Sequence, residues 1–468
     1  MTSLVLSALW GGAAQLDPFG LKTAADLQSE AVFMRMVGGP WYKSTARDKI
    51  TVILVNDAYL DETGEAWPMS YLQQDLLLTD ILGYQPKAVF IDFLYRHQHG
   101  SDAEIAQLAE TIRMSVPDTS GKRIPVFLPF LTRDIPGISS CESSSAKPLR
   151  AADIVQKNSV LEVIRPPQEN RTYIGWNGCG DRYPMYLAGN KELPTPAFAM
   201  YRHYCQQAAN ASSSACQAIL DGNSPKFSHP MVIRWGTGVS ELHDDAMSRG
   251  AVECTRSAEI NRFTYPLTQL AMAIGQSFSS NRERGQAERC TYTDTLYATW
   301  LLGASSGLHE FLETMIKDRY VFIGTKVAGV SDVVLSPVNG QVPGVYLFAM
   351  SLDNLITMGN NYFTELKTVN AGLLEIAILF VIIFSARFLR AFIFCNMGIA
   401  PSVLIYKIAL PLSISLAAAV PLWYFRVAPM DWITVAFLGF VANPVKLSDC
   451  GNHSLTDKIY KTLAPEGK

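Results

Sequence analysis

The chain has 468 residues and a formal net charge of -3, and 49% of its residues are hydrophobic whereas 17% are charged. This charged fraction is low for a purely soluble protein. Lysine and arginine are scattered along the chain, which argues against a nucleic-acid-binding protein, and no acidic tail indicates disorder. The composition therefore favours a large folded domain joined to a membrane-embedded part.

The N-terminal segment does not have the features of a standard signal peptide. Ser3–Leu16 is weakly apolar and contains Trp10 and two glycines, but it has no basic region before it and no clear cleavage site. An exported domain nevertheless needs a segment that starts its translocation. We therefore expect residues 1–20 to form a weak or truncated signal anchor.

Residues 30–365 have the pattern of an α/β domain. Nearly continuous apolar runs, which suit strands buried on both faces of a parallel sheet, alternate with segments whose apolar residues recur at helical spacing. This alternation predicts an α/β fold with a mostly parallel sheet and right-handed crossovers. The expected elements are strands Lys49–Val55, Ala88–Phe93, Ile124–Phe130 and Tyr320–Ile323, and helices Ser70–Leu82, Asp102–Met114 and Val345–Met358.

The middle of this domain is less regular and rich in glycine, proline and asparagine. We expect strands near Tyr173–Trp176 and Met231–Trp235 and a helix over Ala197–Ala209. An even number of cysteines in an exported domain favours disulfides, although six unrelated buried thiols are an equal alternative. Cys205 and Cys216 are close enough in sequence to pair, and the connectivity is otherwise open. The six candidates are Cys141, Cys179, Cys205, Cys216, Cys254 and Cys290.

Residues 371–445 are almost wholly apolar and predict a cluster of about three transmembrane helices. The expected spans are Leu373–Phe384, Leu404–Phe425 and Trp432–Val445. A hydrocarbon core needs about 20 helical residues, so the short third segment either spans a thinned bilayer or is re-entrant. Glu375 and Lys407 lie near span ends and are expected to anchor them at the interface; the alternative is that they couple the spans.

The positively charged residues predict the orientation of these spans. The loop after the first span carries Arg387 and Arg390, and Lys407 lies at the start of the second span. The tail 446–468 carries four lysines. Because cytoplasmic loops are enriched in lysine and arginine, we place this loop and the tail in the cytoplasm. The large domain then lies in the periplasm or outside a bacterial inner membrane; the alternative is the reverse orientation.

Three sequence motifs in this order resemble the CHASE2 domain family. They are NDAYLDETGEAWPMSYLQQDLLLTDIL (Asn56–Leu82), PKAVFIDFLY (Pro86–Tyr95) and DRYVFIGTKVAGVSDVVLSPVNGQVPGVYLFAMSLDNLI (Asp318–Ile356). The resemblance covers roughly Lys49–Val445 and implies an extracytoplasmic sensor module of a bacterial transmembrane receptor. Members of this family usually carry an output domain after the third span. Because this chain ends about 23 residues beyond that span, we expect a separate effector protein.

Acidic residues at predicted strand ends are the candidate ligand-binding residues. Asp57, Asp92 and Asp332 lie at or just past strand ends, where ligands bind in open α/β sheets, and Lys326 could supply a counter-charge. The alternative is that these acids cap loops and helices by accepting backbone N–H bonds.

Two short histidine and aspartate groups contain metal-capable side chains. They are His97, His99 and Asp102, and His243, Asp244 and Asp245. Neither group supplies a clear set of three or four ligands, so we expect solvated loop residues and no metal site.

The motifs of common enzymes and cofactor-binding proteins are missing from the sequence. There is no GxSxG nucleophile elbow, no P-loop and no CxxC pair. We therefore expect no catalytic residues and no cofactor. The favoured function is a membrane sensor that binds an unknown small-molecule or protein ligand and signals through the separate effector. We expect it to form a homodimer in the lipid bilayer. The alternative is an envelope structural or assembly protein.

Overall fold

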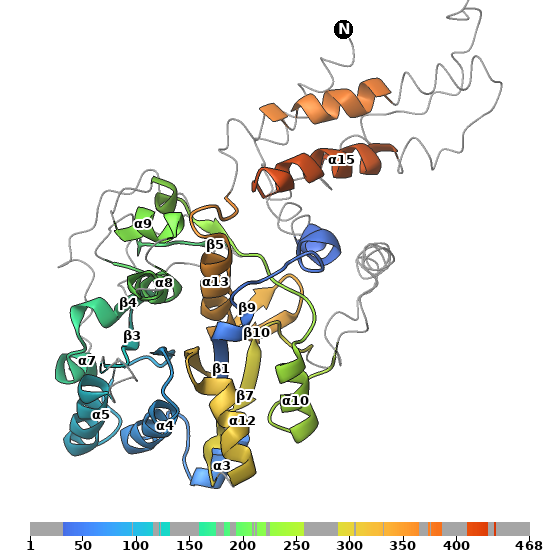
Figure 1. The fold of residues 1–468 in the computed structure, drawn as a ribbon. Helices are drawn as coiled ribbons and strands as arrows, with labels where there is room; N and C mark the ends of the chain where they lie inside the picture. Colours follow the sequence, from blue (N-terminus) through green and yellow to red (C-terminus); the bar gives the residue numbers. More distant parts are fainter. Residues whose placement is uncertain are drawn as a thin grey trace, which may run out of the picture. The chain divides into compact units, whose positions relative to one another are not determined.

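The computed structural model describes two compact units, Met34–Phe363 and Met1–Phe33 together with Thr364–Lys468 (Figure 1). The expected signal anchor at 1–20 and tail at 446–468 lie outside the described residues, as do Cys141, Cys179, Glu375 and Lys407. The described residues are 31–95, 97–115, 121, 123–131, 159–174, 182–187, 193–207, 210, 213–220, 225–256, 289–303, 306–330, 332–364, 373–374, 376–385, 410–428 and 435–436.

A six-stranded sheet forms the centre of the first unit. Its strand order is β4-β3-β2-β8-β1-β7, and every neighbouring pair is parallel. The predicted α/β fold with a mostly parallel sheet is therefore confirmed. The strands are β1 (Ile50–Asn56), β2 (Ala88–Ile91), β3 (Val126–Leu131), β4 (Arg171–Ile174), β7 (Asp294–Tyr297) and β8 (Tyr320–Lys326).

The central strands are buried over nearly their whole length, which explains their continuous apolar sequences. Strand β8 lies between β1 and β2, although it comes more than two hundred residues later in the chain. It is longer than the predicted Tyr320–Ile323, because Gly324 to Lys326 continue the pairing with β1.

The helices that follow β1 and β2 begin at side-chain caps. Asn56 caps α3 (Asp57–Thr63), Ser70 caps α4 (Tyr71–Gly83) and Ser101 caps α5 (Asp102–Met114) by accepting backbone N–H bonds. The predicted bounds of α5 match the structure, and those of α4 differ by one residue at each end. Leu72 and Leu76 share the apolar spacing of α4 but are exposed, so this helix buries only its other apolar residues.

Two further helices lie on the sheet and against each other. Helix α8 (Pro196–Gln206) packs on β3 and β4, and α13 (Val345–Met358) packs on β1, β8 and α8. The predicted bounds of α13 match the structure. The apolar core is continuous across these contacts and includes Phe90, Phe322 and Phe348, whose rings meet edge to face.

The less regular parts of this unit contain short elements. Strands β5 (Arg182–Tyr183) and β6 (Met231–Val232) pair antiparallel, as do β9 (Val333–Ser336) and β10 (Gly340–Pro343). The remaining helices are α7 (Ser159–Ile164), α9 (Ser214–Leu220), α10 (Glu241–Arg249) and α12 (Ser306–Ile316), with a π-helical turn at Met34–Gly38 and 3₁₀ turns at Arg47–Lys49, Gln168–Asn170, Pro225–Ser228 and Ala298–Leu301.

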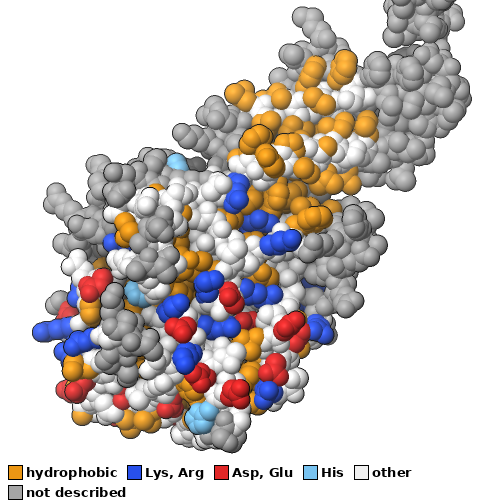
Figure 2. Space-filling model, in the orientation of Figure 1, with side chains coloured by type: hydrophobic (Ala, Val, Ile, Leu, Met, Phe, Trp, Pro, Cys, Tyr) orange, Lys and Arg blue, Asp and Glu red, His pale blue; other side chains and the backbone are white. Residues whose placement is uncertain are grey.

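Apolar helices form the described part of the second unit. Helix 376–385 and α15 (Leu410–Tyr424) run side by side, and hydrophobic side chains cover their visible face (Figures 1 and 2). All three predicted spans contribute to one small apolar cluster, made of Ile378, Leu379, Ile382, Ile383, Ile414 and Val435.

The predicted transmembrane cluster is tested only in part by these segments. None of the helices in the described part of the chain combines the length and the apolar character needed to cross a membrane. Pro411 and Pro421 both lie within α15. Most of the third predicted span falls outside the described residues, as do residues 404–409 of the second span and the loop with Arg387 and Arg390.

Candidate ligand-binding edge of the sheet

The carboxyl edge of the sheet brings two of the predicted acids together. Asp92 follows β2 directly, and Asp332 lies in the segment that joins β8 to β9. Because β2 and β8 are parallel neighbours, their carboxyl ends open at the same edge. The charge of Asp332 acts on Asp92, so the two carboxyls are close enough to influence each other.

Asp92 is held at this edge by its backbone. Its N–H donates to the carbonyl of Ile323 at 2.8 Å, which extends the β2–β8 pairing by one residue. The residue is half-buried. Burial, reinforced by the Asp332 charge, raises the pKa of Asp92 well above its usual range.

Asp332 lies against the first turn of α13. Its carbonyl accepts from the N–H of Gly344 at 3.0 Å, and a methyl group added to Gly344 would lie 2.4 Å from its Oδ1. A glycine is thus required for the carboxylate to approach this helix end. Although the residue as a whole is exposed, burial of the carboxyl raises the pKa of Asp332 too.

The close contact between α13 and β8 depends on a second glycine. A methyl group at Gly324 would lie 2.5 Å from Cβ of Val345, the first residue of α13. A shift of this first turn therefore displaces β8 as well, because the two elements are already in van der Waals contact.

The acid pair favours a cationic partner. Two carboxyls with raised pKa values, close to each other, are stabilised by a proton, a cation or a strong hydrogen-bond donor. Tyr183 on β5 is also within range of this charge: burial, with a smaller contribution from Asp92, raises the pKa of Tyr183, whose ring packs on Phe348.

The other two predicted ligand residues have local partners. The carboxylate of Asp57 accepts from the N–H of Ala328, with both oxygens at 3.2 Å, so it holds the loop after β8. The Nζ of Lys326 donates to the hydroxyl of Tyr297 at 2.9 Å, on the side of β7. In the structure, Asp57 therefore contacts the loop after β8, and Lys326 contacts the last residue of β7.

The histidine groups differ from the expectation of solvated loops. His97 and His99 are exposed, but the His99 ring stacks on Tyr71 with centroids 4.3 Å apart. His243 is fully buried on α10, and its Nδ1 lies 3.1 Å from the carbonyl of Thr293. The expectation for His243 was wrong, since a helix of charged residues hides one inward-facing ring.

The aspartates near these histidines make ordinary surface contacts. Asp102 accepts from Gln98 at 2.7 Å. Asp245 pairs with Arg249 one turn later at 2.9 Å, and Asp244 pairs with Arg256. None of the three lies with the histidines in a common ligand set in the described part of the chain.

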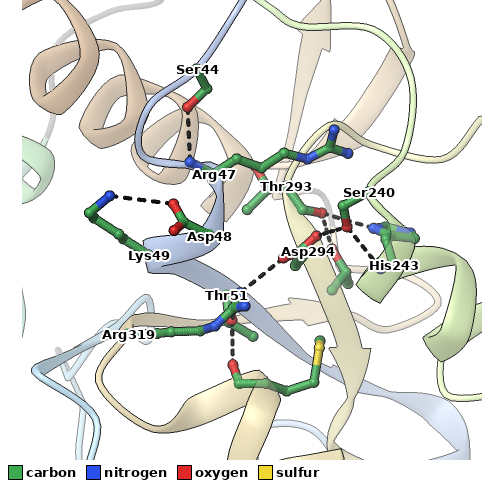
Figure 3. A network of polar contacts seen from close by, with 12 residues as sticks. Ser44, Arg47, Asp48, Lys49, Thr51, Ser240, His243, Thr293, Asp294 and Arg319 are labelled. Carbon is green, nitrogen blue, oxygen red and sulfur yellow. Dashed lines mark hydrogen bonds and ion pairs between the residues drawn. The ribbon is translucent and has the colours of Figure 1, made fainter.

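The opposite edge of the sheet holds a buried polar network (Figure 3). Arg319, which precedes β8, donates to Asp294, the first residue of β7, at 2.9 Å. The same guanidinium lies 3.4 Å from the hydroxyl of Thr51 on β1, and Ser240 donates to Asp294. This network was not predicted, although a charged residue directly before a buried strand is a signal for it.

A second buried acid lies on α13. Tyr42 and Ser44 both donate to the carboxylate of Asp353, the latter at 2.5 Å, so the segment before β1 is bonded to α13. Burial raises the pKa of Asp353 to about 6. The chain entering the α/β unit and the helix leaving it are therefore joined by a titratable group.

Four of the six predicted disulfide candidates form two disulfide bonds. Cys205 on α8 bonds to Cys216 on α9, as the short spacing suggested, and Cys254 bonds to Cys290. Six unrelated thiols are therefore not what the structure shows. Disulfides persist in oxidising compartments, so these bonds agree with an exported domain.

Comparison with known protein families identifies the domain. The family model described as CHASE2 domain matches residues 2–386. The chain belongs to the CHASE2 family. The predicted resemblance is confirmed, and the match extends it to residues before Lys49. Comparison with curated proteins and with solved structures gave no match.

The CHASE2 match includes both the acid pair and α13. CHASE2 domains are extracytoplasmic sensor modules, so sensing is the role that the family supports. The match ends at residue 386, after helix 376–385, so it takes in the first apolar helix as well as the sheet.

Proposed function

We propose that this CHASE2 protein is a sensor of the bacterial inner membrane. Its α/β unit lies in the periplasm or outside and binds a cationic ligand at the Asp92–Asp332 pair. The ligand shifts α13, the apolar C-terminal helices carry the change across the bilayer, and a separate effector protein receives it. The protein acts as a homodimer.

The position of α13 carries this proposal. Its first turn touches Asp332 and Gly324, and its last residues, through Gly359 to Phe363, lead into the apolar C-terminal unit. One 14-residue helix thus has the candidate site at one end and the exit of the α/β unit at the other. A rigid helix is an effective carrier for a small displacement.

Contacts within the second unit support a membrane hairpin. Thr364, which precedes the first apolar helix, pairs with the backbone of Arg426 and Ala428, which follow α15. Two spans joined in this way start and end on the same side, as the charge distribution requires. The Phe33 ring lies 5.3 Å from the Trp423 ring, so the N-terminal segment also reaches α15.

The chemistry of the pair indicates the ligand class. Neutralising one carboxylate removes the repulsion between the two acids, so a ligand with a protonated amine binds with a favourable charge balance. The ligand's ammonium would lie between the two carboxyls, beside the first turn of α13.

Binding of a simple diamine to the solubilised full-length protein tests this site. We expect putrescine to raise the unfolding temperature of the wild type and to have no effect on the Asp92→Asn, Asp332→Asn double variant, because the amide side chains offer no charge. The measurement is a thermal unfolding scan with increasing putrescine. Asp57→Asn is the matched control, since Asp57 is also at a strand end but makes loop contacts.

Equal stabilisation of the wild type and the double variant would contradict the proposed site. Loss of stabilisation in Asp57→Asn alone would place ligand binding on the β1 side of the edge instead.

A further inference from the structure

A cluster of soft ligand atoms lies beside β7, away from the acid pair. Among the described residues, His243, Cys254 and Cys290 are the three metal-capable side chains whose ligand atoms lie within 4.8 Å of one another. A fourth candidate is next to them, because Sδ of Met247 lies 3.4 Å from Sγ of Cys290. The group combines one imidazole, one thioether and two cysteine sulfurs.

The backbone places these residues by simple rules. His243 and Met247 are four residues apart on α10, so they point to the same side of the helix. Cys254 follows the end of α10, and Cys290 precedes β7. Ser240 caps α10 and also bonds to Asp294, which fixes the helix against the first residue of β7 (Figure 3).

The imidazole of His243 is oriented as a metal ligand. Its Nδ1 lies 3.1 Å from the carbonyl of Thr293, which accepts hydrogen bonds only, so Nδ1 carries the hydrogen (Figure 3). The lone pair is then on Nε2, which lies 3.6 Å from Sγ of Cys254. A backbone carbonyl that fixes the tautomer in this way is the usual outer partner of a metal-binding histidine.

The present structure is the oxidised form of this cluster. Cys254 and Cys290 are joined by a disulfide, so neither sulfur is a thiolate ligand. Cys254 is half-buried whereas Cys290 is 4% exposed, so an incoming thiolate reaches Cys254 first.

Reduction by an external dithiol would convert the cluster into a ligand set. One thiolate of the dithiol attacks Sγ of Cys254, the Cys254–Cys290 bond breaks, and Cys290 leaves as a thiolate and takes up a proton. The second thiol of the dithiol then displaces Cys254, which is also protonated. The dithiol becomes a disulfide, and the protein gains two electrons and two protons.

We propose that the reduced Cys254–Cys290 pair, with His243 and Met247, binds one cuprous ion, and that disulfide formation and copper binding exclude each other. Binding of Cu⁺ displaces the two thiol protons and forms two copper–thiolate bonds, with His243 Nε2 and Met247 Sδ completing the site. This inference is independent of the acid pair.

The ligand types favour Cu⁺ over harder ions. Thiolates and thioethers are soft donors that select Cu⁺, whereas Mg²⁺ and Ca²⁺ prefer oxygen. Zinc also accepts two thiolates and an imidazole, but it gains little from a thioether. Met247 therefore distinguishes the two ions: it should matter for Cu⁺ and not for Zn²⁺.

The other disulfide provides a matched control. Cys205 and Cys216 are both buried, and within the described residues no histidine or carboxylate joins them in a group of three. Reduction of that pair frees two thiols but does not assemble the same four ligands.

The test is a Cu⁺ titration of the solubilised full-length protein after reduction, in competition with bicinchoninate. We expect one tightly bound Cu⁺ in the reduced protein and none at this site before reduction. The Cys254→Ser, Cys290→Ser variant should lose at least about 100-fold in affinity, and Met247→Leu about 10-fold, with Zn²⁺ affinity unchanged in the latter. Cys205→Ser, Cys216→Ser should bind Cu⁺ as the wild type does. In every protein tested, the four cysteines outside the two disulfides are replaced by serine; they are Cys141, Cys179, Cys395 and Cys450.

Met247→Leu keeps both the size of the side chain and the disulfide, so it reports on copper even if the double serine variant does not fold. Wild-type Cu⁺ affinity in Met247→Leu, or loss of binding in the Cys205–Cys216 control, would overturn the proposal. X-ray absorption of the loaded protein should show sulfur and nitrogen ligands; oxygen ligands alone would also overturn it.

Discussion

At the scale of single residues, three acids with raised pKa values are the features that most constrain function. Asp92 follows β2, Asp332 lies against the first turn of α13, and Asp353 is buried within that helix. Each carboxyl costs stability when it ionises inside the protein. Such groups are candidates for function because their charge state changes with a ligand or with pH.

Asp353 should make the stability of the protein depend on pH. Its folded pKa of about 6 lies above the unfolded value of about 3.9, so the folded state holds more protons between these values. The free energy of unfolding should therefore fall by about 3 kcal/mol in total as the pH rises from below about 3 to above about 7, with most of the fall between these two pKa values. Urea unfolding at a series of pH values measures this slope.

Asp353→Asn should flatten that slope, because the amide does not ionise and still accepts a hydrogen bond from Tyr42. Asp48→Asn is the control, since Asp48 is exposed and pairs with Lys49 at the surface. An unchanged slope in Asp353→Asn would show that other groups cause the pH dependence.

The candidate site was predicted only in part, for reasons that differ between residues. Asp92 and Asp332 were found because strand ends are visible in the sequence. The local contacts of Asp57 and Lys326 depend on Ala328 and Tyr297, which no spacing rule connects to them. The burial of His243 was not predicted, because its partner Thr293 lies 50 residues later in the sequence.

At the scale of elements, the Arg319–Asp294 pair joins three strands at the amino edge of the sheet. Arg319 precedes β8, Asp294 begins β7, and Thr51 lies on β1 between them. Both charged side chains are nearly inaccessible to solvent, with 10% and 2% exposed. Removing one partner leaves the other charge buried without compensation.

Arg319→Met should therefore destabilise the protein by about 3–5 kcal/mol, because Asp294 loses its counter-charge. Adding Asp294→Asn should recover part of this loss. The exposed pair Lys317–Glu313 is the control, and Lys317→Met should cost less than about 1 kcal/mol. Urea unfolding followed by tryptophan fluorescence measures all four proteins. A cost for Arg319→Met as small as for Lys317→Met would contradict a buried structural pair.

The strands and helices themselves were largely predictable, whereas their order in the sheet was not. Continuous apolar runs and helical spacing are local signals, and α5 and α13 have the predicted bounds. The insertion of β8 between β1 and β2 depends on pairing between residues far apart in the sequence, such as Ile50 with Tyr320 and Ala88 with Tyr320.

At the scale of the whole molecule, a CHASE2 unit with a parallel sheet continues into apolar helices through one element. Helix α13 is bonded to the entry segment through Tyr42 and Ser44, and it leads to Thr364, where the second unit begins. A change at the Asp92–Asp332 pair therefore has a direct covalent route, through α13, to the start of the second unit. In the proposed function, this change is passed on by the apolar helices of two protomers.

Cross-linking between protomers in native membranes tests this coupling most directly. A single reactive cysteine is placed on helix 376–385 as Val381→Cys, whose side chain is exposed in this structure, with the same four cysteines replaced by serine. A bis-maleimide reagent then reports how close the helices of the two protomers lie. The Asp92→Asn, Asp332→Asn variant imitates the neutralised, ligand-bound pair, and Asp57→Asn is the control. The proposed sensor predicts cross-linked dimer in the wild type and in Asp57→Asn, and a changed yield in the double variant. The same yield in all three proteins, or no cross-linked dimer in any, would contradict it.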